Sequence, residues 1–209
     1  MLKKIPLNHL KHFIFCTLFF TNLNHVKAQI FFKSHIGINP YQFETVKEKL
    51  FKHAAVTSAH PLASMVGAAI LQDGGNAFDA AIAVHFALAV VHPAAGNIGG
   101  GGFLLARTNN GNLIGLDFRE AAPAKAYRDM YLDEKGKPIT SKSLEGPLAS
   151  GIPGSVSGVF NAHAYAKLPM AQLIEPAIEL AEYGHALTEK EANSLNSVKG
   201  EVLKLSSAP

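Results

Sequence analysis

Few side chains in this sequence could carry out chemistry, and none of them forms a recognisable catalytic group. The segment 154–158 reads Gly-Ser-Val-Ser-Gly, which is close to the G-x-S-x-G motif of hydrolases, but Val156 stands where the motif needs its serine. The single cysteine, Cys16, lies in an N-terminal segment that we expect to be removed. With neither a serine nor a cysteine nucleophile available, we predict no catalytic residue in this chain.

Three histidines, His60, His85 and His92, raise the question of a metal site. His85 and His92 stand roughly two helical turns apart, but no carboxylate or third histidine falls at a ligand-like spacing between them, and H-E-x-x-H is absent. We therefore predict no metal site and no cofactor, and interpret each histidine as a hydrogen-bonded core or cap residue.

A run of four glycines, Gly99–Gly102, is the most unusual segment. Such a run costs backbone entropy on folding, so it indicates a close approach to the backbone. A phosphate-binding loop does not fit, because G-x-x-x-x-G-K-[ST] is absent and G-x-G-x-x-G would need glycine at Leu104. The run also precedes an expected strand instead of following one. Close packing of the backbone is the better interpretation.

Arg119 is the one side chain with a candidate binding role. It follows a run of strand-forming residues, at the rim of the expected sheet, where a guanidinium can make a two-pronged contact with a carboxylate. The alternative is a salt bridge with Asp117 or Glu120, and the residues taken alone favour that alternative.

The patterns of apolar residues, caps and turns predict the elements that would position Arg119. In chain order these are a strand over 54–59, helices over 62–72 and 77–91, a hairpin of strands 103–108 and 113–118, an irregular segment over 121–147, and helices over 154–167 and 170–183. The second helix is apolar on nearly every side, which is typical of a helix packed between layers. We predict an α+β fold in which helices cover an antiparallel sheet.

The N-terminus has the pattern of a secretory signal peptide. Lys3, Lys4 and Lys11 form a basic start, residues 13–20 are apolar, and an A-x-A-like site ends at Ala28. The alternative is an amphipathic or buried N-terminal helix. We predict a signal peptide over residues 1–28, cleavage before Gln29, a lead-in segment over 29–53, and export to the periplasm or the outside of the cell.

Composition excludes several classes of partner. The mature chain would contain no cysteine and so form no disulfide. The net charge of +3 comes partly from the signal lysines, and no basic cluster remains elsewhere. We therefore expect no nucleic-acid partner and no membrane anchor.

Taken together, these segments resemble the γ-glutamyltransferase family. The matching pieces, which agree with the family in order and spacing over residues 54–187, are His60–Ser64, Gly74–Ala81, His92–Phe103, Leu116–Pro123, Gly151–Val156 and Pro176–Ala181. After Leu187 the resemblance becomes weaker, and the final residues are either native helix or an altered tail.

The resemblance implies an N-terminal-nucleophile hydrolase with an αββα sandwich. Members are made as one precursor that cleaves itself into a large and a small subunit, and a threonine at the head of the small subunit attacks the γ-glutamyl amide. Glutathione and other γ-glutamyl compounds are the donors, and water, amino acids or peptides are the acceptors. Residues 54–209 would be the N-terminal portion of the large subunit, truncated, with the small subunit missing.

Carried over residue by residue, the resemblance assigns one site residue to this chain. The arginine that binds the donor's α-carboxylate falls on Arg119, which shifts the interpretation of Arg119 from a salt bridge to a substrate contact. The resemblance places no nucleophile here, so the chain alone is expected to be inactive. Two alternatives stay open: a related amide hydrolase such as a cephalosporin acylase, and a non-enzymatic exported product of a truncated gene.

Overall fold

The computed structural model describes residues 50–206, so the predicted signal peptide and most of the lead-in segment lie outside the described residues. Among the described residues, Val56–Ala177 form one compact unit, and residues 50–55 and 178–206 belong to a second. The first unit contains Arg119 and all the residues that position it.

Two helices, α2 (Pro61–Gln72) and α3 (Ala77–Val91), pack against each other and hold most of the core of this unit. The Nδ1 atom of His60 accepts a hydrogen bond of 3.2 Å from Leu62 N, so His60 caps α2 as predicted. Both predicted helices are confirmed.

Asp79, in the first turn of α3, is completely buried and joins two distant parts of the chain. Its carboxylate accepts from Asn76 N at 2.7 Å, from Lys167 N at 3.0 and 3.1 Å, and from Leu168 N at 2.9 Å. Beside it, Asn76 Nδ2 donates to Tyr165 O at 2.8 Å. The start of α3 is thereby fastened to the segment 165–168.

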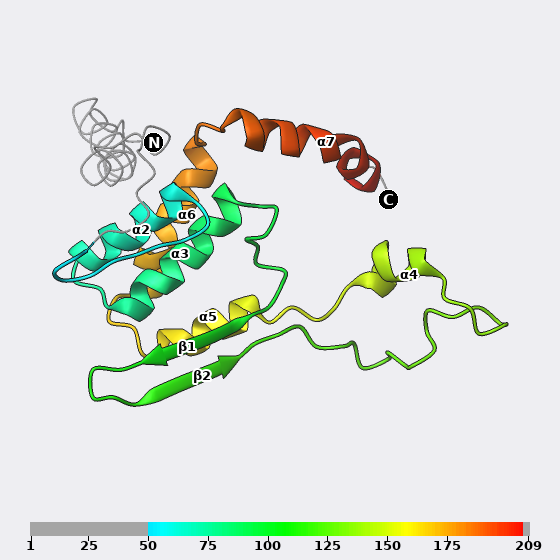
Figure 1. Ribbon diagram of the computed structural model, residues 1–209, viewed down its shortest axis with the longest axis horizontal. Coiled ribbons are helices and arrows are strands. Elements are labelled where there is room, and N and C mark those ends of the chain that lie inside the picture. The colour runs from blue at the N-terminus through cyan, green and yellow to red at the C-terminus, as the bar shows by residue number, and fades with distance from the viewer. Residues whose placement is uncertain (1–49, 207–209) are drawn as a thin grey trace, which may run out of the picture. The chain divides into compact units, whose positions relative to one another are not determined.

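The sheet of the described residues is the antiparallel hairpin of β1 (Phe103–Arg107) and β2 (Leu113–Asp117), which confirms the prediction with slightly shorter strands. Leu104, Ala106, Ile114 and Leu116 share the more buried face, and α5 (Ser155–His163) lies along the hairpin (Figure 1). The opposite face carries exposed apolar side chains.

Two sequence predictions about secondary structure are wrong. Residues 54–59 form no strand, because no other strand among the described residues pairs with them. The helix predicted over 154–167 ends at His163. The next three residues make tighter backbone bonds to the third residue before them, and the N–H groups of Lys167 and Leu168 donate to the Asp79 carboxylate instead of continuing the helix.

The segment 121–147 is largely irregular, as predicted, apart from the short helix α4 (Thr140–Leu144) and a 3-10 turn, η1 (Pro147–Ala149), that follows it. An isolated bridge between Ala121 and Ile152 closes its two ends.

Two further helices complete the described chain. Helix α6 (Met170–Tyr183) is confirmed and ends before Gly184, whose φ is +73°. Residues beyond Leu187, for which two interpretations were open, form the helix α7 (Glu189–Ser206). Within residues 50–206, no helix combines the length and apolar character that crossing a membrane requires.

Candidate functional site

The backbone of Arg119 is held between glycines on two sides. A Cβ added to Gly101 would lie 2.8 Å from Arg119 Cα and 2.7 Å from Glu120 N. On the other side, a Cβ on Gly154 would lie 2.0 Å from Phe118 O. The segment Phe118–Glu120 can therefore occupy this place only because both neighbours lack a side chain.

Hydrogen bonds fix the same segment. Gly102 and Phe118 exchange two backbone bonds, of 3.0 and 3.3 Å, just beyond the hairpin strands. Gly100 O accepts from both Gly154 N and Ser155 N at 2.9 Å, which ties the glycine run to the start of α5. The expectation of close backbone packing at the glycine run is confirmed, and its packing partner is the segment that carries Arg119.

The side chain of Arg119 is exposed over 64% of its surface and has two neighbours. Its Nε lies 3.2 Å from Glu120 Oε2, and its Cζ lies 5.9 Å from the centre of the Phe103 ring. The salt bridge expected from the residues is thus present with Glu120. Asp117 instead accepts from Arg119 N at 3.0 Å.

This ion pair leaves the guanidinium able to bind a ligand. An exposed pair of this kind contributes only about 0–1 kcal/mol to stability, so stability alone is a weak reason for the arginine. Among the described residues, Glu120 is the one carboxylate that pairs with the Arg119 guanidinium, and its Oε2 lies 3.2 Å from Nε. With 64% of its side chain exposed, the guanidinium can still offer two N–H groups to the two oxygens of a ligand carboxylate.

A hollow of about 410 Å³ lies beside Glu120, and its other polar lining includes His85, His92, Asn97 and Ser155. Within the described chain, Ser155 Oγ and His85 Nε2 are buried and have no hydrogen-bond partner. Burial lowers the pKa of His85, which favours its neutral form in the folded chain. Lowering the pH below about 6.5 therefore destabilises the fold, because His85 binds a proton more readily in the unfolded chain than in the folded one.

The histidines do not gather into a metal site. His60 caps α2 and His92 is the C-terminal cap residue of α3, while His85 lies on α3 beside the hollow. Across residues 50–206, no three His, Cys, Asp or Glu side chains lie in a group that could hold a metal ion.

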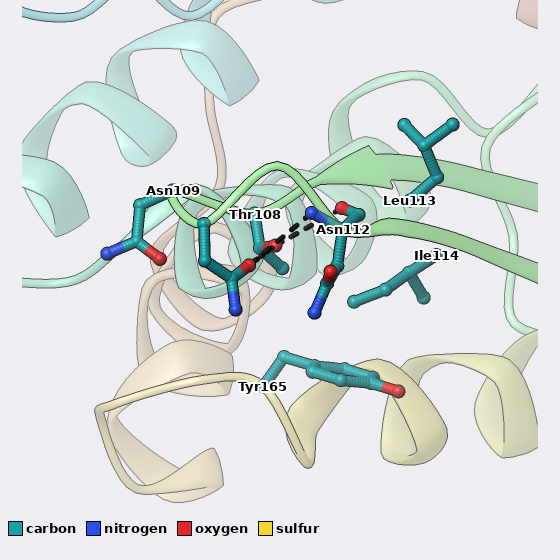
Figure 2. A pocket seen from close by; sticks show the side chains of 7 residues that line it. Thr108, Asn109, Asn112, Leu113, Ile114 and Tyr165 are labelled. Atoms are coloured by element: carbon teal, nitrogen blue, oxygen red, sulfur yellow. Dashed lines mark hydrogen bonds between the residues drawn. The ribbon is translucent and has the colours of Figure 1, made fainter.

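A second hollow, of about 620 Å³, lies at the turn of the hairpin (Figure 2). Asparagine side chains of the turn and the ring of Tyr165 line it, and Tyr165 stacks on Phe78 with ring centres 5.1 Å apart. Because the turn joins the strand ends opposite to Arg119, this hollow is separate from the arginine.

Sequence reasoning proposed Arg119 as the site residue but did not foresee that Phe103, Glu120 and Gly154 lie beside it. Phe103 was noted as part of a strand and of a matching segment, Gly154 as part of a matching segment and of the motif-like segment 154–158, and Glu120 as a salt-bridge partner. The fourfold glycine run was a signal for close approach, but the sequence did not say that the approaching backbone would be that of Arg119.

Comparison with known proteins places this arrangement in a family. Residues 63–208 match the model of the gamma-glutamyltranspeptidase family. The glutathione hydrolase proenzyme of Escherichia coli is 50% identical over 168 residues, which is 80% of this chain and 28% of that protein. The Acylase ACY 1 proenzyme of a Pseudomonas species is 42% identical over 147 residues, covering 67% of this chain and 26% of that protein.

A solved structure gives the same result. The gamma-glutamyltranspeptidase of Helicobacter pylori superposes with a TM-score of 0.71 at 48% identity, covering 75% of this chain and 45% of that one. The chain belongs to the gamma-glutamyltranspeptidase family. It spans about a quarter of the length of the curated relatives it matches.

Proposed function

We propose that this chain is the N-terminal segment of an exported γ-glutamyltransferase. The enzyme cleaves the γ-glutamyl amide of glutathione and transfers the glutamyl group to water or to an amino acid or peptide. Arg119 binds the α-carboxylate of the donor. The observation that carries the proposal is the fixed backbone of Arg119 combined with an exposed guanidinium that pairs, among the described carboxylates, with Glu120 alone.

The chemistry proposed for Arg119 follows from its charge and shape. The guanidinium carries a positive charge, and its planar fork matches the two oxygens of a carboxylate. The ion pair with Glu120 is made at Nε, and the side chain is exposed enough for a substrate carboxylate to reach it. The bond to be cleaved lies at the far end of the glutamyl side chain, so Arg119 binds and orients the donor and does not itself react.

The nucleophile belongs, in this proposal, to the part of the enzyme that corresponds to the remaining length of the relatives. The fold of the whole enzyme is then the αββα sandwich, of which the hairpin β1–β2 and the neighbouring helices form a portion. Export rests on the pattern of residues 1–28, which lie outside the described structure. The γ-glutamyl donor is favoured over an acylase substrate because the relative with the higher identity is named a glutathione hydrolase.

The first prediction concerns Arg119 in the mature enzyme that contains this chain. Arg119→Ala or Arg119→Lys is expected to raise the KM for glutathione at least tenfold, because losing one partner of a desolvated charge pair costs about 2–5 kcal/mol. The increase should appear mainly in KM if Arg119 holds the ground state and the transition state equally. Steady-state kinetics with glutathione measure it.

The donor itself supplies the sharpest control. The glutathione analogue whose glutamyl group is replaced by 4-aminobutanoyl lacks the α-carboxylate, so its KM should change far less in the Arg119 variants. Arg128→Ala removes another exposed arginine, which pairs with Asp129, and should leave the KM for both donors unchanged. An unchanged KM for glutathione in a correctly processed Arg119→Ala enzyme would show that Arg119 has only a structural role.

The second prediction concerns the isolated 209-residue chain. It is expected to release no glutamate from glutathione above the uncatalysed rate, because it supplies a substrate-binding arginine and no recognisable nucleophile. The measurement is glutamate release by the purified chain. Turnover that persists after repeated purification would contradict the assignment of the nucleophile to another part of the enzyme.

A further inference from the structure

Phe103, the first residue of β1, is an aromatic side chain that the described core does not bury. It is 63% exposed, whereas the core of this unit is built mainly on α2 and α3 and the other face of the hairpin is half-buried. Leu105 and Leu113, on the same outer face, are also exposed, at 89% and 81%. Phe103 differs from these two leucines because it has a charged neighbour, Arg119.

The register of the hairpin brings Phe103 and Arg119 together. Phe103 pairs with Asp117, and Arg119 follows two residues later, which is the spacing that returns a side chain to the same face of a strand. The Arg119 Cζ lies 5.9 Å from the centre of the Phe103 ring, within the range of a cation–π contact. Glu120 Oε2 contacts the same guanidinium at Nε.

These two contacts restrict a side chain that would otherwise be mobile. A free arginine populates many rotamers, and fixing it on ligand binding costs affinity. The ring face of Phe103 attracts the guanidinium from one side, and the Glu120 carboxylate attracts it at Nε. Together they favour a narrow set of Arg119 rotamers before any ligand binds.

We propose that Phe103 is a positioning residue that holds the Arg119 guanidinium by its aromatic face in the orientation that accepts the donor's α-carboxylate. This inference rests on the proposed function of Arg119 and adds a specificity determinant to it. Phe103 touches no reacting atom and acts through Arg119.

The test uses Phe103→Leu, which keeps an apolar side chain but removes the ring, in the mature enzyme that contains this chain. The expected result is a rise of about threefold to tenfold in the KM for glutathione with little change in kcat, from the usual strength of a cation–π contact. Phe103→Tyr, which keeps the ring face, should restore the KM. Leu105→Ala, on the same exposed face, should leave it unchanged.

Two further measurements separate positioning from a structural role. The KM for the 4-aminobutanoyl donor should not change in Phe103→Leu, because that donor makes no contact with the guanidinium. In an Arg119→Ala background, Phe103→Leu should have no further effect on the KM for glutathione, because its effect passes through Arg119.

The outcomes distinguish this inference from the proposed function. If Arg119→Ala leaves the KM for glutathione unchanged, the proposed function fails. If Arg119→Ala raises the KM for glutathione but Phe103→Leu changes the KM of neither donor, or changes the KM of both donors equally, the positioning role of Phe103 is wrong. Should Phe103→Leu not yield mature enzyme, Phe103→Met, whose longer unbranched side chain also lacks a ring, replaces it with the same expected pattern.

Discussion

Asp79→Ala is expected to unfold the unit formed by Val56–Ala177, or to destabilise it by roughly 3–5 kcal/mol, since each buried donor left unsatisfied costs about 1–3 kcal/mol. The carboxylate serves the N–H groups of Asn76, Lys167 and Leu168, and alanine would leave all three without their acceptor. Asp79 itself is completely buried, so alanine would also remove packing from the core.

The measurement is the urea concentration at the midpoint of unfolding, followed by circular dichroism, in the mature enzyme that contains this chain. Asp79→Asn keeps one acceptor oxygen and should lose less stability than Asp79→Ala. Glu134→Ala removes an exposed carboxylate from the irregular segment and should have almost no effect. Equal midpoints for Asp79→Ala and Glu134→Ala would show that the buried carboxylate does not hold the two segments together.

Gly154→Ala is expected to displace the segment that carries Arg119. The new Cβ would lie 2.0 Å from Phe118 O and 3.0 Å from Arg119 O, and both are backbone atoms that cannot rotate away. The φ of Gly154 is −110°, which any residue adopts, so the effect comes from steric overlap of the new Cβ and not from backbone strain. Overpacking of this kind costs about 1–3 kcal/mol. A shift of about 1 Å at a positioning residue can lower the rate about a hundredfold.

The glycine run provides a matched control for this prediction. Gly101→Ala would place a Cβ 2.7–2.8 Å from the backbone of Phe118, Arg119 and Glu120, and should resemble Gly154→Ala. At Gly99 the nearest atom to an added Cβ is Asn97 Oδ1 at 3.8 Å, an ordinary contact, so Gly99→Ala should be tolerated. The readout is kcat/KM for glutathione together with urea unfolding. Equal activity for the three variants would refute the role of close backbone approach.

Local patterns determined much of this fold without the tertiary structure. Asn76 in front of an apolar run predicted the start of α3, because a capping side chain needs only the N–H groups of the next turn. The asparagine- and glycine-rich turn predicted the hairpin for the same reason, since its conformation depends on four or five neighbouring residues. Both features rest on contacts between residues close in sequence.

The errors arose where a distant residue decided the local structure. Residues 54–59 have the composition of a strand, but a strand exists only with a partner, and the sequence does not show whether a partner lies beside it. The helix beginning at Ser155 stops at His163, and the backbone N–H of Lys167, which a longer helix would bond internally, donates instead to Asp79, far away in sequence. Intrinsic helix preference could not reveal that competition.

For the candidate site, the sequence determined which side chain carries the positive charge and the tertiary structure decided how it is held. The residue type of Arg119 and its place after a strand were enough to suggest a carboxylate contact, because that chemistry belongs to the guanidinium itself. Its orientation depends on the Phe103 ring, on Glu120, and on glycines at 101 and 154 that leave room for its backbone. These contacts join residues from separate segments, and only folding brings those segments within reach of one another.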